Sequence, residues 1–256
     1  MVITGADGVA KQRATRPACE ASERVDENVR IIRENIARAA EKSGRSATNV
    51  KLIGVTKTVD VSRIRTLLAC GVTDLGENRA QEFLPKYVEL LDEAPSWHFI
   101  GHLQRNKVKQ IIDKVCMIHS VDSLDLALEI DKRAKMANKV IDVLIEINIA
   151  GEANKQGTSP ENAKVFSEQV FELPNVRLRG LMCVPPFVEN SEENRLFFRK
   201  MRILGVDIFG TGRYNSITSY DSIPCELSMG MSGDYAAAIE EGATMVRIGT
   251  ALVGGR

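Results

Sequence analysis

The sequence predicts a single-domain α/β protein that folds as a closed (β/α)8 TIM barrel. Short apolar segments alternate with amphipathic segments along the chain, which is the pattern of parallel strands joined by crossover helices. The chain has 256 residues, close to the ~250 that one such barrel commonly uses. An open, doubly wound sheet is the alternative, and it is disfavoured because no G-x-G-x-x-G motif follows the first predicted strand.

The first two elements show the pattern most clearly. A helix is predicted over residues 22–44, where apolar residues recur at helical spacing and charged residues occupy the opposite face. Residues 50–57, VKLIGVTK, are too few for a helix and β-branched enough for a buried strand. Asp60 is placed to cap a second helix over residues 61–70, and Gly71 suits its end.

The strand–helix unit recurs along the rest of the chain. Further strands are predicted at residues 73–75, 97–100, 117–119, 141–149, 177–182, 225–229 and 244–248. Further helices are predicted at residues 79–91, 106–112, 123–136, 160–171, 192–204 and 234–241. Pro160 suits the first turn of its helix. Residues 205–224, rich in Gly, Ser, Thr and Tyr, fit neither pattern and are interpreted as an excursion or a functional lid, with the excursion favoured.

The composition is that of an ordinary globular protein. Hydrophobic residues make up 44% of the chain, enough to fill a core, so disorder is excluded as the main state. Lys and Arg balance Asp and Glu at 34 each, which gives no support for nucleic-acid binding. Arg105, Lys107 and Lys109 are accordingly interpreted as a solvated helix face. No apolar stretch approaches the ~18 residues of a membrane helix, so we expect no membrane binding.

Cysteine and histidine usage argues against disulfides and metals. The scattered, odd-numbered cysteines are Cys19, Cys70, Cys116, Cys183 and Cys225. They form no C-x-x-C pair, and the three histidines lack the spacing of helical metal ligands, so we expect no metal site and a reducing, cytoplasmic setting. Residues 1–20 lack the apolar core of a secretory signal, although organellar targeting stays open. They are interpreted as a flexible tail before a barrel over residues 21–256.

In barrels of this kind the working site lies at the carboxyl ends of the strands. The polar and small residues expected there are Lys57, Glu77, Asn78, His98–His102, Asn148, Met182, Ser228–Ser232 and Arg247–Thr250. Lys57 is the most informative, because it leaves an apolar strand, and an amine shielded from water can form an imine with an aldehyde. The alternative for this residue alone is a surface lysine whose stem follows the barrel rim.

Two segments after the last strands are suited to an anion. Residues 227–232, LSMGMS, and residues 246–250, VRIGT, offer backbone N–H groups and hydroxyls where barrels often bind phosphate. Either segment alone could simply form turns and caps. Together with Lys57 they favour a site for an aldehyde that carries a phosphate.

Five segments, in this order, resemble the pyridoxal-phosphate homeostasis proteins, which are single-domain relatives of the alanine racemase N-terminal barrel. The segments are LIGVTKT, GENRAQE, WHFIGHLQRNK, LRGLM and LSMGMSGDYAAAIEEGATMVRIGTALVG. The resemblance extends from about Val29 to Gly254 and departs at residues 205–224, which look longer than the link usual in the family. It implies the same barrel, with pyridoxal 5'-phosphate as the cofactor.

The resemblance also implies roles for individual residues. Lys57 looks like the lysine that holds the cofactor as an aldimine, Arg247 matches an arginine beside the pyridine nitrogen, and Asn78 matches a residue beside the cofactor. The residues that fall where the family binds the phosphate are Ser228, Met229 or Ser232, with Gly249 and Thr250. His98 and Asn148 are weaker matches, expected at the barrel mouth.

The function implied is intracellular vitamin B6 and amino-acid homeostasis without strong catalysis. An arginine keeps the ring nitrogen unprotonated, which makes the ring a poorer electron sink. The alternative is a fold-type III pyridoxal-phosphate enzyme such as an amino-acid racemase. Alanine racemases take their second acid–base group from a further domain and a partner subunit, whereas this sequence stops at Arg256. We expect a monomer whose partners are the cofactor, amino acids and apo-enzymes that receive the cofactor.

Overall fold

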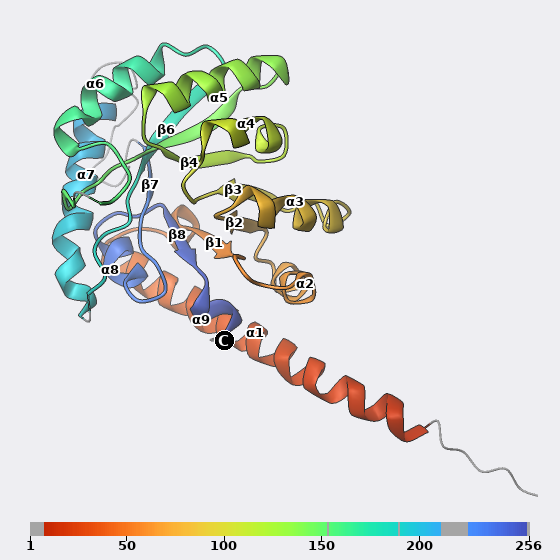
Figure 1. The fold of residues 1–256 in the computed structure, drawn as a ribbon. Helices are drawn as coiled ribbons and strands as arrows, with labels where there is room; N and C mark the ends of the chain where they lie inside the picture. Colours follow the sequence, from red (N-terminus) through yellow and green to blue (C-terminus); the bar gives the residue numbers. More distant parts are fainter. Residues whose placement is uncertain (1–7, 153, 189, 211–224, 255–256) are drawn as a thin grey trace, which may run out of the picture.

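The computed structural model describes residues 8–152, 154–188, 190–210 and 225–254, with side chains from Arg24 onward. Eight parallel strands form a closed barrel in chain order, and the first strand pairs with the last (Figure 1). The strands are β1 (Lys51–Val55), β2 (Asp74–Glu77), β3 (Ser96–Phe99), β4 (Met117–Val121), β5 (Ile141–Glu146), β6 (Val176–Met182), β7 (Glu226–Ser228) and β8 (Met245–Ile248). The predicted closed barrel is therefore confirmed, and the open sheet is excluded.

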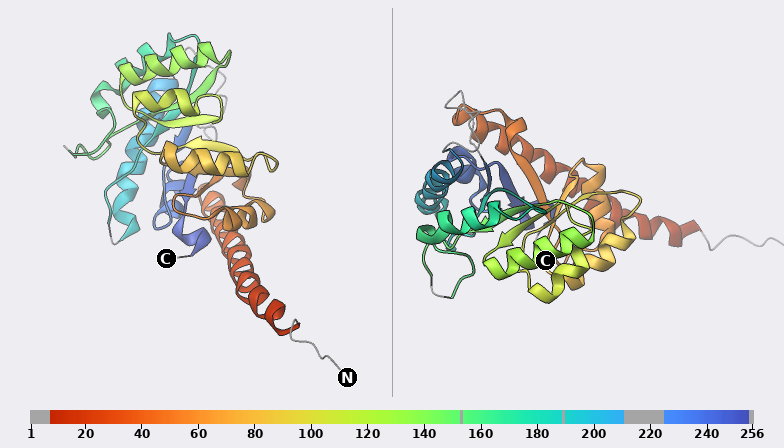
Figure 2. Two further views of the ribbon diagram at one scale, coloured as in Figure 1. Left: turned by 45° about the vertical axis from the view of Figure 1, so that its right-hand side comes forward. Right: turned by 90° about the horizontal axis from the view of Figure 1, so that it is seen from above.

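The helices lie around the outside of the strands (Figure 2). They are α1 (Gly8–Lys42), α2 (Val61–Ala69), α3 (Ala80–Glu89), α4 (Arg105–Ile111), α5 (Leu124–Met136), α6 (Pro160–Phe171), α7 (Arg195–Phe209), α8 (Tyr235–Glu240) and α9 (Thr250–Val253). Two 3-10 turns, η1 (Ala47–Asn49) and η2 (Ser191–Asn194), precede β1 and α7. The local signals hold: the Asp60 side chain accepts a hydrogen bond from Arg63 N, and Gly71 has a φ of 77° after α2.

The two largest differences between predicted and observed boundaries are at the start of α1 and at the end of α7. α1 begins at Gly8, ahead of the predicted start at residue 22, and projects past the barrel (Figures 1 and 2). The flexibility of residues 1–20 stays a prediction, and residues 1–7 lie outside the described part of the chain. The predicted helix end at residue 204 is wrong, because α7 continues to Phe209. Of the unassigned segment, residues 211–224 lie outside the described residues.

Gly205 explains why the end of α7 was misplaced. Glycine in a sequence favours a helix end, but here it lies inside the helix where α7 packs on β7. A Cβ at this position would lie 2.9 Å from Cys225 Sγ and 3.2 Å from Leu227 Cδ2. The residue is small because two elements approach closely, not because the helix ends.

Most of the hydrophobic core lies between the strands and the helices. A separate cluster of buried apolar residues comes from five different strands: Ile53, Met117, Leu144, Met182 and Met245. The interior of the barrel also holds buried polar side chains, among them His98, His119, Ser228 and Arg247. These polar groups connect the barrel interior to the site described below.

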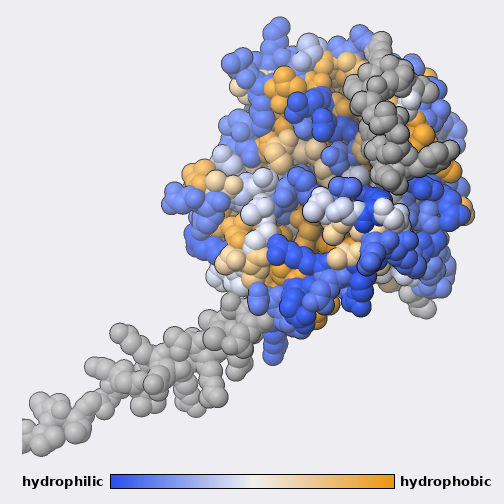
Figure 3. Space-filling view, turned by 180° about the vertical axis from the view of Figure 1, so that it is seen from behind, coloured by the Kyte–Doolittle hydropathy of each residue, from blue (hydrophilic) through white to orange (hydrophobic). Residues whose placement is uncertain are grey.

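The described residues include neither a candidate membrane-spanning helix nor a cluster of potential metal ligands. None of their helices is long and apolar enough to cross a bilayer, and nowhere in that part of the chain do three His, Cys, Asp or Glu residues gather as metal ligands. The described cysteines Cys70, Cys116, Cys183 and Cys225 are free thiols. Seen from behind, the surface mixes hydrophilic and hydrophobic residues (Figure 3).

Candidate functional site

A cavity of about 980 Å³ opens at the carboxyl ends of the strands. Six of the eight predicted cofactor residues line it: Lys57, Asn78, Ser232, Arg247, Gly249 and Thr250. Lys57 and Asn78 follow β1 and β2. Ser232 follows β7, Arg247 belongs to β8, and Gly249 and Thr250 lie between β8 and the first turn of α9. Because β1 lies between β2 and β8 in the closed barrel, residues from both ends of the chain meet at one opening.

The other two predicted residues lie deeper. Ser228 is fully buried behind Arg247 and accepts a hydrogen bond from Arg247 Nη1 at 2.7 Å. Met229 is fully buried in the main hydrophobic core. Its neighbour Met231 lines the cavity instead. Ser228 is therefore linked to the cavity only through Arg247, and the Met229 side chain does not line the cavity.

Neither of the two weaker matches, His98 and Asn148, lines the cavity, contrary to expectation. The His98 ring extends inside the barrel, where its Nε2 lies 3.0 Å from Asp74 Oδ1. Asn148 binds its own loop, because its Nδ2 donates to Glu152 O at 2.8 Å and its Oδ1 accepts from Glu152 N at 3.1 Å. A position after a strand predicts the right end of the barrel, but it does not predict the direction of the side chain.

Lys57 lies at the mouth of the cavity with its backbone held on both sides. The preceding carbonyl, Thr56 O, accepts a hydrogen bond from Lys86 Nζ at 2.6 Å, and the following amide, Thr58 N, donates to Glu82 Oε2 at 3.0 Å. Thr58 has a φ of 60°, a left-handed conformation that costs a β-branched residue about 1–2 kcal/mol. The Lys57 side chain itself is exposed, so the predicted shielding from water is not observed. Within the described residues its amine makes no hydrogen bond or ion pair.

A buried ion pair supports this end of β1. Lys86 Nζ lies 2.6 Å from Glu77 Oε1, and the two side chains are 11% and 1% exposed. The Glu77 carboxylate also accepts from Thr56 Oγ1 at 2.8 Å and from Asn78 N at 3.2 Å. The sequence predicts Glu77 at a strand end but does not reveal Lys86, since a lysine on a predicted helix carries no signal of burial.

Two orphaned amide oxygens indicate that the cavity is shaped for a ligand. Asn78 Oδ1 and Asn194 Oδ1 are buried and have no hydrogen-bond partner within the described part of the chain, and both residues line the cavity. A buried acceptor without a donor is unfavourable, so such groups in a cavity fit a molecule that brings donors. Asn194, held by its Nδ2 to Asp234 Oδ2 at 2.9 Å, was missed because it lies in a predicted helix outside any motif.

The charges that line the cavity favour an anion. Its basic side chains are those of Lys57, Arg63, Lys155 and Arg247, against the single acidic side chain of Asp234. Burial lowers the pKa of Arg247, but a guanidinium stays charged in proteins. Arg247 Nη2 donates to Cys183 O at 2.8 Å, which fixes the group at the cavity wall.

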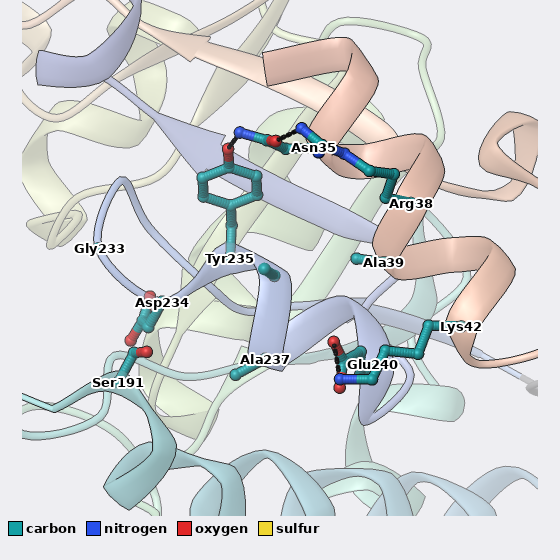
Figure 4. A pocket seen from close by; sticks show the side chains of 11 residues that line it. Asn35, Arg38, Ala39, Lys42, Ser191, Gly233, Asp234, Tyr235, Ala237 and Glu240 are labelled. Atoms are coloured by element: carbon teal, nitrogen blue, oxygen red, sulfur yellow. Dashed lines mark hydrogen bonds and ion pairs between the residues drawn. The ribbon is translucent and has the colours of Figure 1, made fainter. Parts of the chain in front are cut away.

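A second, smaller cavity of about 370 Å³ adjoins the first between α1 and α8 (Figure 4). The two cavities share Ser191, Gly233 and Asp234. The Tyr235 ring points toward α1, where Asn35 Nδ2 donates to its hydroxyl at 2.9 Å (Figure 4). The first helix of the barrel therefore supports the wall that carries Gly233 and Asp234.

Glu146, at the end of β5, is expected to make stability depend on pH. Burial and the nearby Asp122 raise the pKa of its carboxyl to about 7, although Arg247 acts in the opposite direction. Because this pKa exceeds the ordinary value of 4.5, the folded chain binds more protons between these values, and stability falls as the pH rises through them. From pH 5 to pH 8, the free energy of unfolding of Glu146→Gln relative to the parent should increase by about 2 kcal/mol. Urea unfolding at both pH values measures this difference, and parallel profiles would contradict it.

The chain matches a known family along most of its length. The family described as "Alanine racemase, N-terminal domain" matches residues 28–256. A "Pyridoxal phosphate homeostasis protein" from Aquifex aeolicus (strain VF5) is 49% identical over 230 residues, which cover 90% of this chain and 97% of that protein. A protein of the same name from Pseudomonas aeruginosa is 39% identical over 91% of this chain and 96% of its own length.

Solved structures show the same similarity. PipY of Synechococcus elongatus PCC7942, with PLP bound, is 33% identical and superposes with a TM-score of 0.71 over 80% of this chain and 93% of its own. A protein of unknown function from Bifidobacterium adolescentis gives a TM-score of 0.81 at 33% identity, over 91% of this chain and 96% of its own. A D-threonine aldolase from Filomicrobium marinum, at 15% identity and a TM-score of 0.65, shares the fold alone.

Proposed function

This chain belongs to the family of pyridoxal phosphate homeostasis proteins, and we propose that it binds pyridoxal 5'-phosphate in the cavity of about 980 Å³. One observation carries the proposal: the Lys57 amine, which has no partner among the residues that the structure describes, shares this cavity with the unpaired Asn78 and Asn194 oxygens and with an excess of basic side chains. A phosphorylated aldehyde with a ring hydroxyl matches all three features. The cofactor would supply the aldehyde and a conjugated ring that can stabilise negative charge.

Each lining residue has a defined task in this proposal. Lys57 would hold the cofactor through its amine, which can condense with an aldehyde and release the aldehyde oxygen as water. Arg247 would serve as a donor to the ring nitrogen, and Asn78 Oδ1 as an acceptor for the ring hydroxyl. Ser232, Gly249 and Thr250 would hold the phosphate. Support for the phosphate end comes from Gly233, where an added Cβ would meet no atom within 4 Å, so a ligand can approach the backbone.

The direct test is retention of the cofactor. Protein incubated with pyridoxal 5'-phosphate and then dialysed is expected to keep about one equivalent per chain, seen as a visible absorption band that borohydride bleaches. A protein that remains colourless, with no mass increase after borohydride treatment, would show that the cavity binds something else.

We further propose a role in intracellular vitamin B6 and amino-acid homeostasis rather than strong catalysis. Arginine is always a donor, so a ring nitrogen beside Arg247 stays unprotonated and stabilises a carbanion poorly. The protein loaded with pyridoxal phosphate is expected to racemise L-alanine with a turnover number below about 1 per second, which is the lower end of the range for typical enzymes. Optical rotation measures this rate, and sustained turnover above it would favour the alternative, a fold-type III enzyme such as a racemase.

The proposed setting is the cytoplasm, with a monomeric protein that passes the cofactor to apo-enzymes. An open cavity mouth with an exposed lysine supports exchange of the ligand. Mixing the loaded protein with an apo-enzyme that needs pyridoxal phosphate should restore that enzyme's activity. Sedimentation velocity measures the oligomeric state, which is expected to be a monomer.

A further inference from the structure

A line of hydrogen bonds crosses the inside of the barrel, starting from the cavity. Arg247 Nη1 donates to Ser228 Oγ at 2.7 Å, and Ser228 Oγ lies 2.9 Å from His119 Nδ1. His119 Nε2 lies 2.9 Å from His98 Nδ1, and His98 Nε2 lies 3.0 Å from Asp74 Oδ1. The five residues belong to β8, β7, β4, β3 and β2. Asp74, His98, His119 and Ser228 are called the barrel relay below.

The middle of the barrel relay is sealed from water. His98 is 2% exposed, and His119 and Ser228 are 0% exposed. Asp74 is partly exposed at the opposite end of the barrel, where Lys51 Nζ pairs with it at 3.1 Å. Since buried polar groups need partners for their donors, few arrangements of the protons are acceptable.

Because Arg247 can only donate, the hydrogen bonds of the barrel relay all run in one direction, from Ser228 to Asp74. Arg247 can only donate, so Ser228 Oγ accepts from it, and the Ser228 proton goes to His119 Nδ1. His119 then carries its own proton on Nε2 and donates to His98 Nδ1, and His98 donates from Nε2 to the Asp74 carboxylate. In the reverse direction, His119 would donate to Ser228, and the buried Ser228 proton would have no acceptor among the side chains and carbonyls that the structure describes.

The surroundings keep His119 neutral and Asp74 ionised. Burial, together with His98, Arg247 and Lys51, lowers the pKa of His119 well below its usual 6.5, so this ring is neutral. Burial acts to raise the pKa of Asp74, but the hydrogen bonds from His98 and Lys51 outweigh it and hold the pKa below the usual 3.8. A neutral His119 ring therefore lies between the Arg247 guanidinium and the Asp74 carboxylate. The other titratable neighbours of Arg247 are Cys183, Glu146 and Asp234.

We propose that Asp74, His98, His119 and Ser228 are positioning residues that hold the Arg247 guanidinium as a fixed donor toward the ligand of the cavity. The relay keeps the Ser228 oxygen available as an acceptor, and Cys183 O accepts the second bond, so the guanidinium is held at both terminal nitrogens. The identity of the ligand as pyridoxal phosphate rests on the proposed function. The relay itself is a property of the protein without ligand.

The direction of the relay can be measured directly in the unloaded protein. Nitrogen-15 NMR of the imidazole rings distinguishes a proton on Nδ1 from a proton on Nε2, and the chain has three histidines in all. His119 is expected as a neutral ring protonated on Nε2 from pH 6 to pH 8, and His98 is expected to carry a proton on the Nε2 that faces Asp74. The exposed His102 is assigned through His102→Gln. A proton on Nδ1 of His119 would overturn the proposal.

Two substitutions at His119 separate positioning from packing. His119→Phe fills the space of the ring but cannot accept the Ser228 proton, whereas His119→Asn brings an oxygen acceptor and leaves a void. If the relay positions Arg247, pyridoxal phosphate should bind about tenfold more weakly to the Phe variant than to the Asn variant. A role in packing alone predicts the reverse order, because the Asn variant has the larger void.

Affinities come from absorption titrations of variants whose far-UV circular dichroism matches the parent. Met117→Leu, another buried change inside the barrel on β4, is the control and should bind as the parent does. Equal affinities of the two His119 variants, or tighter binding by the Phe variant, would overturn the positioning role. A parent that binds no pyridoxal phosphate would contradict the proposed function, and the imidazole assignment would then decide the relay by itself.

Discussion

Replacing Lys57 by alanine is expected to abolish covalent capture of pyridoxal phosphate. The parent, treated with cofactor and borohydride, should carry one pyridoxyl group on the peptide that contains Lys57. In Lys57→Ala the label should fall to background, because the amine of Lys155, which also lines the cavity, is paired with Glu152 and is not expected to replace the nucleophile that forms the C=N bond. Peptide mass spectrometry locates and quantifies the label.

Lys155→Ala is the matched control, since Lys155 is the other lysine that lines the cavity. Its amine is paired with Glu152 Oε1 at 2.6 Å, so it is less available for reaction than Lys57. This variant should label as the parent does. Label that persists at one defined lysine in Lys57→Ala, or disappears in Lys155→Ala, would show that the site has been assigned to the wrong residue.

Lys86→Met is expected to cause the largest loss of stability. The substitution leaves the Glu77 carboxylate buried without its cation, and breaking such a pair costs about 3–5 kcal/mol. It also removes the donor that holds Thr56 O, directly before Lys57, so cofactor capture should become slower in the molecules that remain folded. Urea unfolding measures the stability, and the rate of absorbance change after mixing with pyridoxal phosphate measures capture.

Two further proteins complete this experiment. Lys42→Met removes a surface ion pair of similar length, 2.9 Å to Glu240 Oε1, and should change stability by less than about 1 kcal/mol. Adding Glu77→Gln to Lys86→Met removes the stranded charge and should recover part of the loss. A Lys86→Met protein as stable as Lys42→Met would mean that the buried pair contributes little.

The fold could be predicted from the sequence because its signals are local. A β-branched run such as residues 50–57, a capping Asp60 and a Pro160 at a first helical turn each report on a few neighbours, and all three agree with the structure. Gly205 shows the limit of this kind of prediction. Glycine is required there because a side chain would collide with Cys225, which is twenty positions along the chain. A local sequence pattern cannot distinguish such close packing from a helix end.

The site could be predicted only in part, for a similar reason. The carboxyl end of a strand specifies where a residue emerges, which sufficed for Lys57, Gly249 and Thr250. The direction of a side chain depends on barrel closure, so His98 proved to lie inside, hydrogen-bonded to a residue of another strand. His119 was weighed only as a metal ligand, because its partnership with Ser228 crosses the barrel from β4 to β7.

The pairing of β1 with β8 has a consequence for biosynthesis. Lys57 is synthesised well before Gly249 and Thr250. A growing chain therefore lacks the β8 side of the proposed site until its last strand has been made. The visible absorption of bound pyridoxal phosphate would then appear only after β8 has paired with β1. The time course of this absorption during refolding would therefore report when the barrel closes.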